Sequence, residues 1–147
     1  TGIHDRQYAP PRWVCEGLGT LFEAPGVFAP RSHPQQADRL NTYRLERFTA
    51  YLRRREKRGA LAEFIATDRL FESDTDAAYA EAWALSYFLA ETRPKQYVQY
   101  LQRTAGADGK PPGVTDSERL QEFAEVFGSN LALLETHYLR FMAQWAK

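Results

Sequence analysis

Residues 77–91 read AAYAEAWALSYFLAE, and we expect the other helices to be arranged around the helix that this segment predicts. Aromatic side chains, leucines and alanines occupy almost every position around a helical circumference, so hardly any polar stripe is left to face water. A helix that is apolar on all sides is stable where other elements surround it. We therefore predict a central, buried helix over residues 77–91.

The segments on either side carry amphipathic patterns and capping signals. Prolines open the first helix, and Thr115 with Glu118 forms a capping box. Asp38 is the expected N-cap of a long helix that Gly59 follows. The expected helices cover residues 11–23, 38–58, 61–65, 95–103, 115–127 and 131–145. Three prolines predict an irregular surface connection over residues 25–37.

No segment alternates with the period of a strand, so the predicted fold class is all-α: a compact bundle of about six or seven helices. The 147 residues, 44% of them hydrophobic, suffice for one core and a single domain over 1–147. Lys plus Arg and Asp plus Glu number 19 each, so no net field attracts nucleic acid. No apolar run is long enough to be a transmembrane segment. The sequence leaves the cellular location undetermined.

The first predicted helix contains WVCEGLGTLFE, residues 13–23. Gly17 and Gly19 each cost roughly 1 kcal/mol relative to alanine inside a helix. Small residues there predict close approach by another helix. Glu16 lies opposite the apolar stripe of Val14, Leu18, Leu21 and Phe22, and the local pattern allows either a solvated glutamate or a functional one.

Two stretches resemble gluzincin zinc peptidases. Residues 13–23 are similar to the W-x-x-E-G-x-A helix of that superfamily, which implies that Glu16 is a zinc ligand. Residues 78–89 are similar to the P-Y-E-K-G-x-A-L-L helix of gluzincin aminopeptidases, which implies that Tyr79 is catalytic and stabilises the oxyanion. Packing alone is the alternative role for Tyr79. Ala82 replaces the glycine of the aminopeptidase pattern, so substrate recognition does not transfer.

A wider pattern resembles the domain-of-unknown-function family 1570. It comprises residues 1–3, the prolines before Trp13, Asn41 with Arg44, and residues 78–85. In that family an HExxH motif precedes the threonine–glycine step, and this sequence contains no HExxH. The resemblance implies the C-terminal helical part of a parent zinc metallopeptidase acting on a peptide or protein substrate. We expect this part alone to bind no zinc and to be inactive. The alternative is a non-catalytic helical scaffold or protein-binding domain.

The remaining polar groups favour ordinary structural roles. His4, His33 and His137 lack the spacing of a zinc-binding pair. The basic run at residues 53–58 is expected to be a solvated helix end. Cys15, the only cysteine, permits no intrachain disulfide and is expected to serve packing.

A partner helix for residues 11–23 is not evident in this sequence. The surface around Trp13, Gly17 and Thr20 is therefore expected to be exposed, or covered by a second copy in a homodimer.

Overall fold

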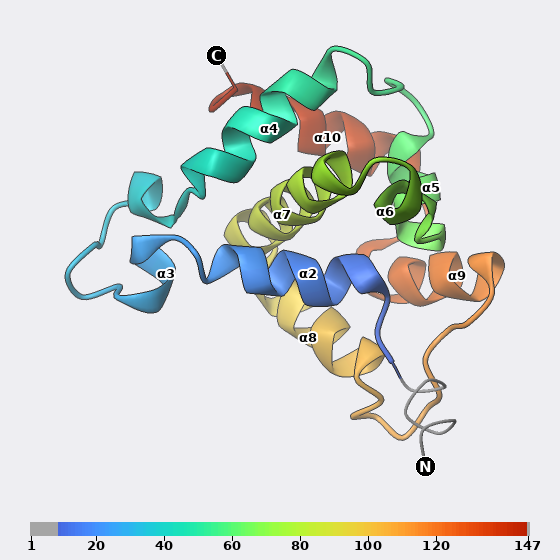
Figure 1. The fold of residues 1–147 in the computed structure, drawn as a ribbon. Coiled ribbons are helices and arrows are strands. Elements are labelled where there is room, and N and C mark those ends of the chain that lie inside the picture. Colours follow the sequence, from blue (N-terminus) through green and yellow to red (C-terminus); the bar gives the residue numbers. More distant parts are fainter. Residues whose placement is uncertain (1–8, 147) are drawn as a thin grey trace.

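A computed structural model describes residues 9–146 (Figure 1). These residues form helices and no strand, which confirms the all-α class. Seven helices have seven residues or more: α2 (Arg12–Leu21), α4 (Thr42–Leu52), α5 (Ala60–Ala66), α7 (Thr75–Thr92), α8 (Pro94–Thr104), α9 (Asp116–Phe127) and α10 (Leu131–Ala143). The shorter elements are α3 (Pro25–Phe28), η1 (Gln36–Arg39) and α6 (Arg69–Ser73).

Helix α7 forms the centre of the bundle, as predicted. It contacts α2, α4, α6, α8 and α10, which lie around it in Figure 1. Ala82, Trp83 and Leu85 are fully buried, as are most side chains along its length. No helix of residues 9–146 is both long enough and apolar enough to span a bilayer.

Trp13 anchors α2 to the other side of the core. Its ring stacks on Tyr100 of α8, with 5.7 Å between ring centroids. It also contacts Phe64 of α5 and Phe123 of α9, each at 6.3 Å. One aromatic side chain therefore joins four helices, and α2 is an integral part of the core.

Two expectations for the region between α2 and α5 are wrong. Residues 25–37 are not wholly irregular, because they contain α3 at their start, and η1 begins near their end and extends past it. The long helix over 38–58 is replaced by α4, which ends at Leu52 and is capped by Asn41 rather than Asp38. Asp38 instead belongs to the capping box of η1. Gly59, with φ of 87°, is the N-cap of α5. The short helix α6 was not predicted.

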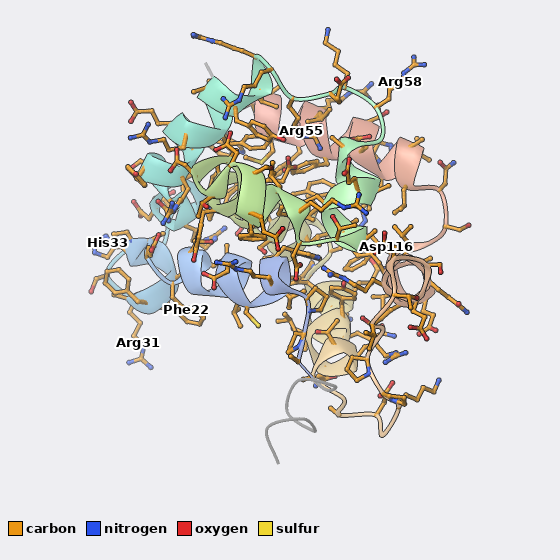
Figure 2. All side chains as sticks on the ribbon, turned by 45° about the vertical axis from the view of Figure 1, so that its right-hand side comes forward. Phe22, Arg31, His33, Arg55, Arg58 and Asp116 are labelled. Carbon is orange, nitrogen blue, oxygen red and sulfur yellow. The ribbon has the colours of Figure 1, made fainter. Side chains whose placement is uncertain are left out.

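A buried ionic network explains why the helix ends early. The Arg55 side chain is only 1% exposed; its Nε lies 2.7 Å from Glu81 Oε1, and its Nη2 lies 3.0 Å from Glu135 Oε2. The Tyr138 hydroxyl donates to Glu81 over 2.7 Å. Figure 2 shows Arg55 between the helices while Arg58 extends outward. The expectation that the whole basic run is solvated is thus wrong for Arg55, which two carboxylates compensate.

Candidate functional site

Gly17 allows α2 to lie directly on α7. A Cβ atom at this position would lie 2.1 Å from Ser86 Oγ and 2.7 Å from the Ala82 carbonyl oxygen. The predicted close approach of a second helix is therefore confirmed at Gly17. Gly19 faces away, and a Cβ there would meet no described atom within 4 Å.

The predicted exposure around Trp13, Gly17 and Thr20 is wrong. Trp13 is 1% exposed, Thr20 is 3% exposed, and Gly17 is buried. The chain's own helices cover this face, so no second copy is needed to bury it. Thr20 is buried without cost to its hydroxyl, which donates to the Gly17 carbonyl over 2.7 Å.

The exposed side of α2 is a different one from that predicted. Phe22 was assigned to the apolar stripe, yet it follows the last turn and is 56% exposed. It points outward in Figure 2. Cys15 is also exposed, which corrects its assignment to packing. Partial burial and the neighbouring carboxylates of Glu16 and Asp68 raise the pKa of the Cys15 thiol, and this disfavours a reactive thiolate.

Glu16 lies at the border between the buried and exposed sides of α2, and it is partly buried. Within the described part of the chain, its carboxylate takes part in no hydrogen bond and no ion pair. Glu23, two turns further on, differs: it accepts a 2.6 Å hydrogen bond from Asn41 Nδ2 and lies 3.6 Å from Arg44 Nε. As far as residues 9–146 are concerned, Glu16 is thus a carboxylate whose acceptor atoms are not engaged.

Tyr79 lies near the start of α7 and is partly buried. Phe71 of α6 meets its ring edge-on, with 5.7 Å between centroids. The guanidinium carbon of Arg44 lies 5.1 Å from the centre of the same ring. These two contacts restrict the ring, while the hydroxyl makes no hydrogen bond to any residue among 9–146. The arrangement suits a hydrogen-bond donor and also satisfies the packing alternative.

Arg44 is a residue of the site to which the sequence assigned no role. Its only signal was the Asn41–Arg44 pair, and the structure shows that Asn41 Oδ1 caps α4 by accepting from the Arg44 backbone N–H over 3.2 Å. The pair therefore has a local structural reason. The side chain of Arg44 then reaches Tyr79, which the sequence does not reveal.

The described residues do not form a zinc site by themselves. No group of three or more His, Cys, Asp or Glu side chains converges anywhere in residues 9–146. His33 follows α3, and His137 is exposed on α10. His4 lies outside the described residues. Glu16 could therefore supply one zinc ligand, and the others would have to come from elsewhere.

One pocket of the described residues lies apart from these candidates. It has a volume of about 430 Å³ and opens between the α4–α5 connection, α5 and α6, with Arg55 and Glu81 in its lining. Neither Glu16 nor Tyr79 lines it. The candidate residues Glu16, Arg44 and Tyr79 thus come from α2, α4 and α7, and both α2 and α4 pack on α7.

One family comparison includes both candidate residues. The sequence model of the family described as "Protein of unknown function (DUF1570)" matches residues 1–112. The chain belongs to this family. The DUF1570 match extends from before α2 to beyond α8, so α9 and α10 lie outside it. No curated protein and no solved structure matches the chain. The DUF1570 description assigns no activity, and the resemblance to that family stated from the sequence is confirmed.

Proposed function

We propose that this DUF1570 chain is the helical part of a gluzincin-type zinc metallopeptidase, in which Glu16 is a zinc ligand and Tyr79 stabilises the oxyanion. The observation that carries the proposal is the free carboxylate of Glu16, partly buried and without a described partner. A carboxylate whose oxygens are not engaged by the described residues can serve as a ligand for a bound cation. Gly17, the next residue, brings α2 directly against α7, the helix that bears Tyr79.

The chemistry of such a site requires more than this chain offers. Catalytic zinc takes three protein ligands and keeps a fourth position for water, which it activates when bound. The proposal therefore needs two histidines, and the glutamate of an HExxH motif, from outside residues 9–146. The chain by itself is expected to be inactive.

Tyr79 can contribute through its own hydroxyl. A phenol that donates a hydrogen bond to a developing oxyanion acts like other oxyanion donors, each of which is worth about 2.7–4 kcal/mol. Such a donor is most effective when its orientation is already set before the reaction. The contacts of the Tyr79 ring with Phe71 and Arg44 support this requirement.

Glu16→Gln in a protein that includes the HExxH segment is expected to lower zinc affinity by about 100-fold or more, because a direct ligand is lost. Bound zinc per chain is measured by mass spectrometry after dialysis against a chelator series. Glu23→Gln, two turns further along the chain just after α2, is the matched control, and it should retain zinc. Undiminished zinc in Glu16→Gln would remove Glu16 from the ligand set. A parental reading frame without HExxH would make the peptidase assignment wrong.

A non-catalytic helical scaffold or protein-binding domain is the second candidate. It is favoured by two large apolar side chains at the surface, Phe22 at 56% and Phe28 at 60% exposure. Under this alternative, the region around Phe22 contacts another protein or a second copy in a homodimer. Sedimentation that shows a monomer over a wide concentration range would contradict the homodimer.

A further inference from the structure

We propose that Arg44 is a carboxylate-binding residue, which holds an acidic group of a peptide ligand beside Tyr79. This interpretation rests on the proposed peptidase function. If that function holds, Arg44 selects substrates that carry a carboxylate close to the scissile bond. The carboxylate belongs either to an acidic side chain or to a free C-terminus.

The hydrogen bonding of Arg44 differs from that of comparable arginines. The arginines that are partly or fully buried within residues 9–146 are Arg39, Arg44, Arg55, Arg93, Arg103 and Arg119. All except Arg44 donate at least one guanidinium hydrogen bond to a described residue. Arg44 donates none to residues 9–146, and its Nε, like that of Arg119, is buried without a hydrogen-bond partner among them. The Nη groups of Arg44 are not among the buried atoms and donate to no described residue, so a ligand acceptor could reach them and pair with N–H groups that have no protein partner among residues 9–146.

The orientation of the guanidinium is already restricted. Its central carbon lies 5.1 Å from the ring centroid of Tyr43 and 5.1 Å from that of Tyr79. These cation–π contacts limit rotation of a side chain that is only 18% exposed. A guanidinium presents its N–H groups in a planar fork that matches a carboxylate. Because less side-chain freedom remains to be lost on binding, the cost of association is lower.

The charges around Arg44 leave room for a ligand. Glu23 is its nearest carboxylate, but the 3.6 Å separation exceeds hydrogen-bond distance, and Asn41 already donates to the same oxygen over 2.6 Å. Arg47, one turn along α4, faces Asp76 at 3.7 Å, and both are about half exposed. A ligand carboxylate would compete with Glu23 and would gain hydrogen bonds that Glu23 does not make.

The test uses the 147-residue chain and three short peptides. The first is N-acetyl-Ala-Ala-Glu-Ala-Ala amide, with a side-chain carboxylate. The second is N-acetyl-Ala-Ala-Ala with a free C-terminus, and the third is the neutral Gln version of the first. Binding is followed by NMR through the arginine Nε–Hε resonances and the tyrosine rings. At least one of the two carboxylate peptides is expected to bind more tightly than the neutral one. Whichever carboxylate peptide binds more tightly shows whether the bound carboxylate comes from an acidic side chain or from a free C-terminus.

Variants connect the binding to Arg44. Arg44→Gln is expected to weaken it by about tenfold. Arg53→Gln, an exposed arginine just after α4, should leave it unchanged. Glu23→Gln should tighten binding because the competing charge is gone, and this variant keeps the test valid if Arg44→Gln does not fold. Equal binding of the neutral peptide, no binding at all, or an unchanged affinity in Arg44→Gln would overturn the proposal. Zinc content is measured separately, so the proposed function can fail while this inference holds.

Discussion

Replacing Arg55 by alanine is expected to lower the free energy of unfolding by about 3–5 kcal/mol, because it leaves two buried carboxylates without their cation. Glu81 is 1% exposed and would retain only the hydrogen bond from Tyr138. Burial alone would lower the pKa of Arg55, but Glu81 and Glu135 outweigh it and raise that pKa above its ordinary value. The guanidinium is therefore charged, and its loss leaves the charges of Glu81 and Glu135 uncompensated.

Urea unfolding followed by far-ultraviolet circular dichroism measures this loss. Arg53→Ala is the control, two residues earlier, exposed and without a described ion pair, and it should change the stability by at most about 0.5 kcal/mol. The double variant Arg55→Met with Glu81→Leu should lose less than Arg55→Ala, because Glu81 is no longer left charged without its cation, while Glu135 keeps the backbone N–H donors of Gly59 and Leu61. Nearly equal stability of Arg55→Ala and Arg53→Ala would contradict the buried network.

Substituting the two glycines of α2 by alanine is expected to have opposite effects. Gly17→Ala should destabilise the protein by about 1–3 kcal/mol through overpacking. The added methyl group would meet the Ala82 carbonyl oxygen at 2.7 Å, and a backbone atom cannot rotate away as the Ser86 hydroxyl can. Gly19→Ala should stabilise by about 0.5–1 kcal/mol, because helix propensity improves and nothing lies within 4 Å.

Thermal and urea unfolding of both variants test this pair. Ser86→Ala combined with Gly17→Ala should recover part of the loss, because it removes the 2.1 Å contact but leaves the backbone carbonyl. If Gly17→Ala were as stable as Gly19→Ala, then α2 could not lie so close to α7 that an added Cβ meets the Ala82 carbonyl oxygen.

Features with local causes could be predicted from the sequence. The buried helix followed from its apolar circumference, and α9 begins at the predicted Thr115–Glu118 capping box and ends at Gly128. The end of α4 could not be predicted in this way. Residues 53–58 are good helix formers, so propensity extends the helix. The partner that draws Arg55 inward, Glu81, is 26 residues away in the chain.

The candidate site also combines features that the sequence predicted with features that depend on distant contacts. The cost of two glycines predicted a close helix, but the sequence did not show that α7 approaches Gly17 alone. The surface around Thr20 was expected to be exposed because no partner helix for α2 was evident in the sequence, whereas the chain's own helices cover it and a hydrogen bond within α2 satisfies the Thr20 hydroxyl. The roles of Glu16 and Tyr79 stay predictions. That the Arg44 guanidinium donates to no residue among 9–146 depends on what folds around it, and no spacing in the sequence encodes that.

The central position of α7 also determines how the molecule opens. Since α2, α4, α6, α8 and α10 all rest on it, no outer helix can expose the α7 backbone by detaching alone. Amide hydrogens near Trp83 should therefore exchange with solvent only through global unfolding, while those of α3 exchange through local fluctuations. The bundle is expected to behave as a single cooperative unit, with its slowest-exchanging amides along one helix.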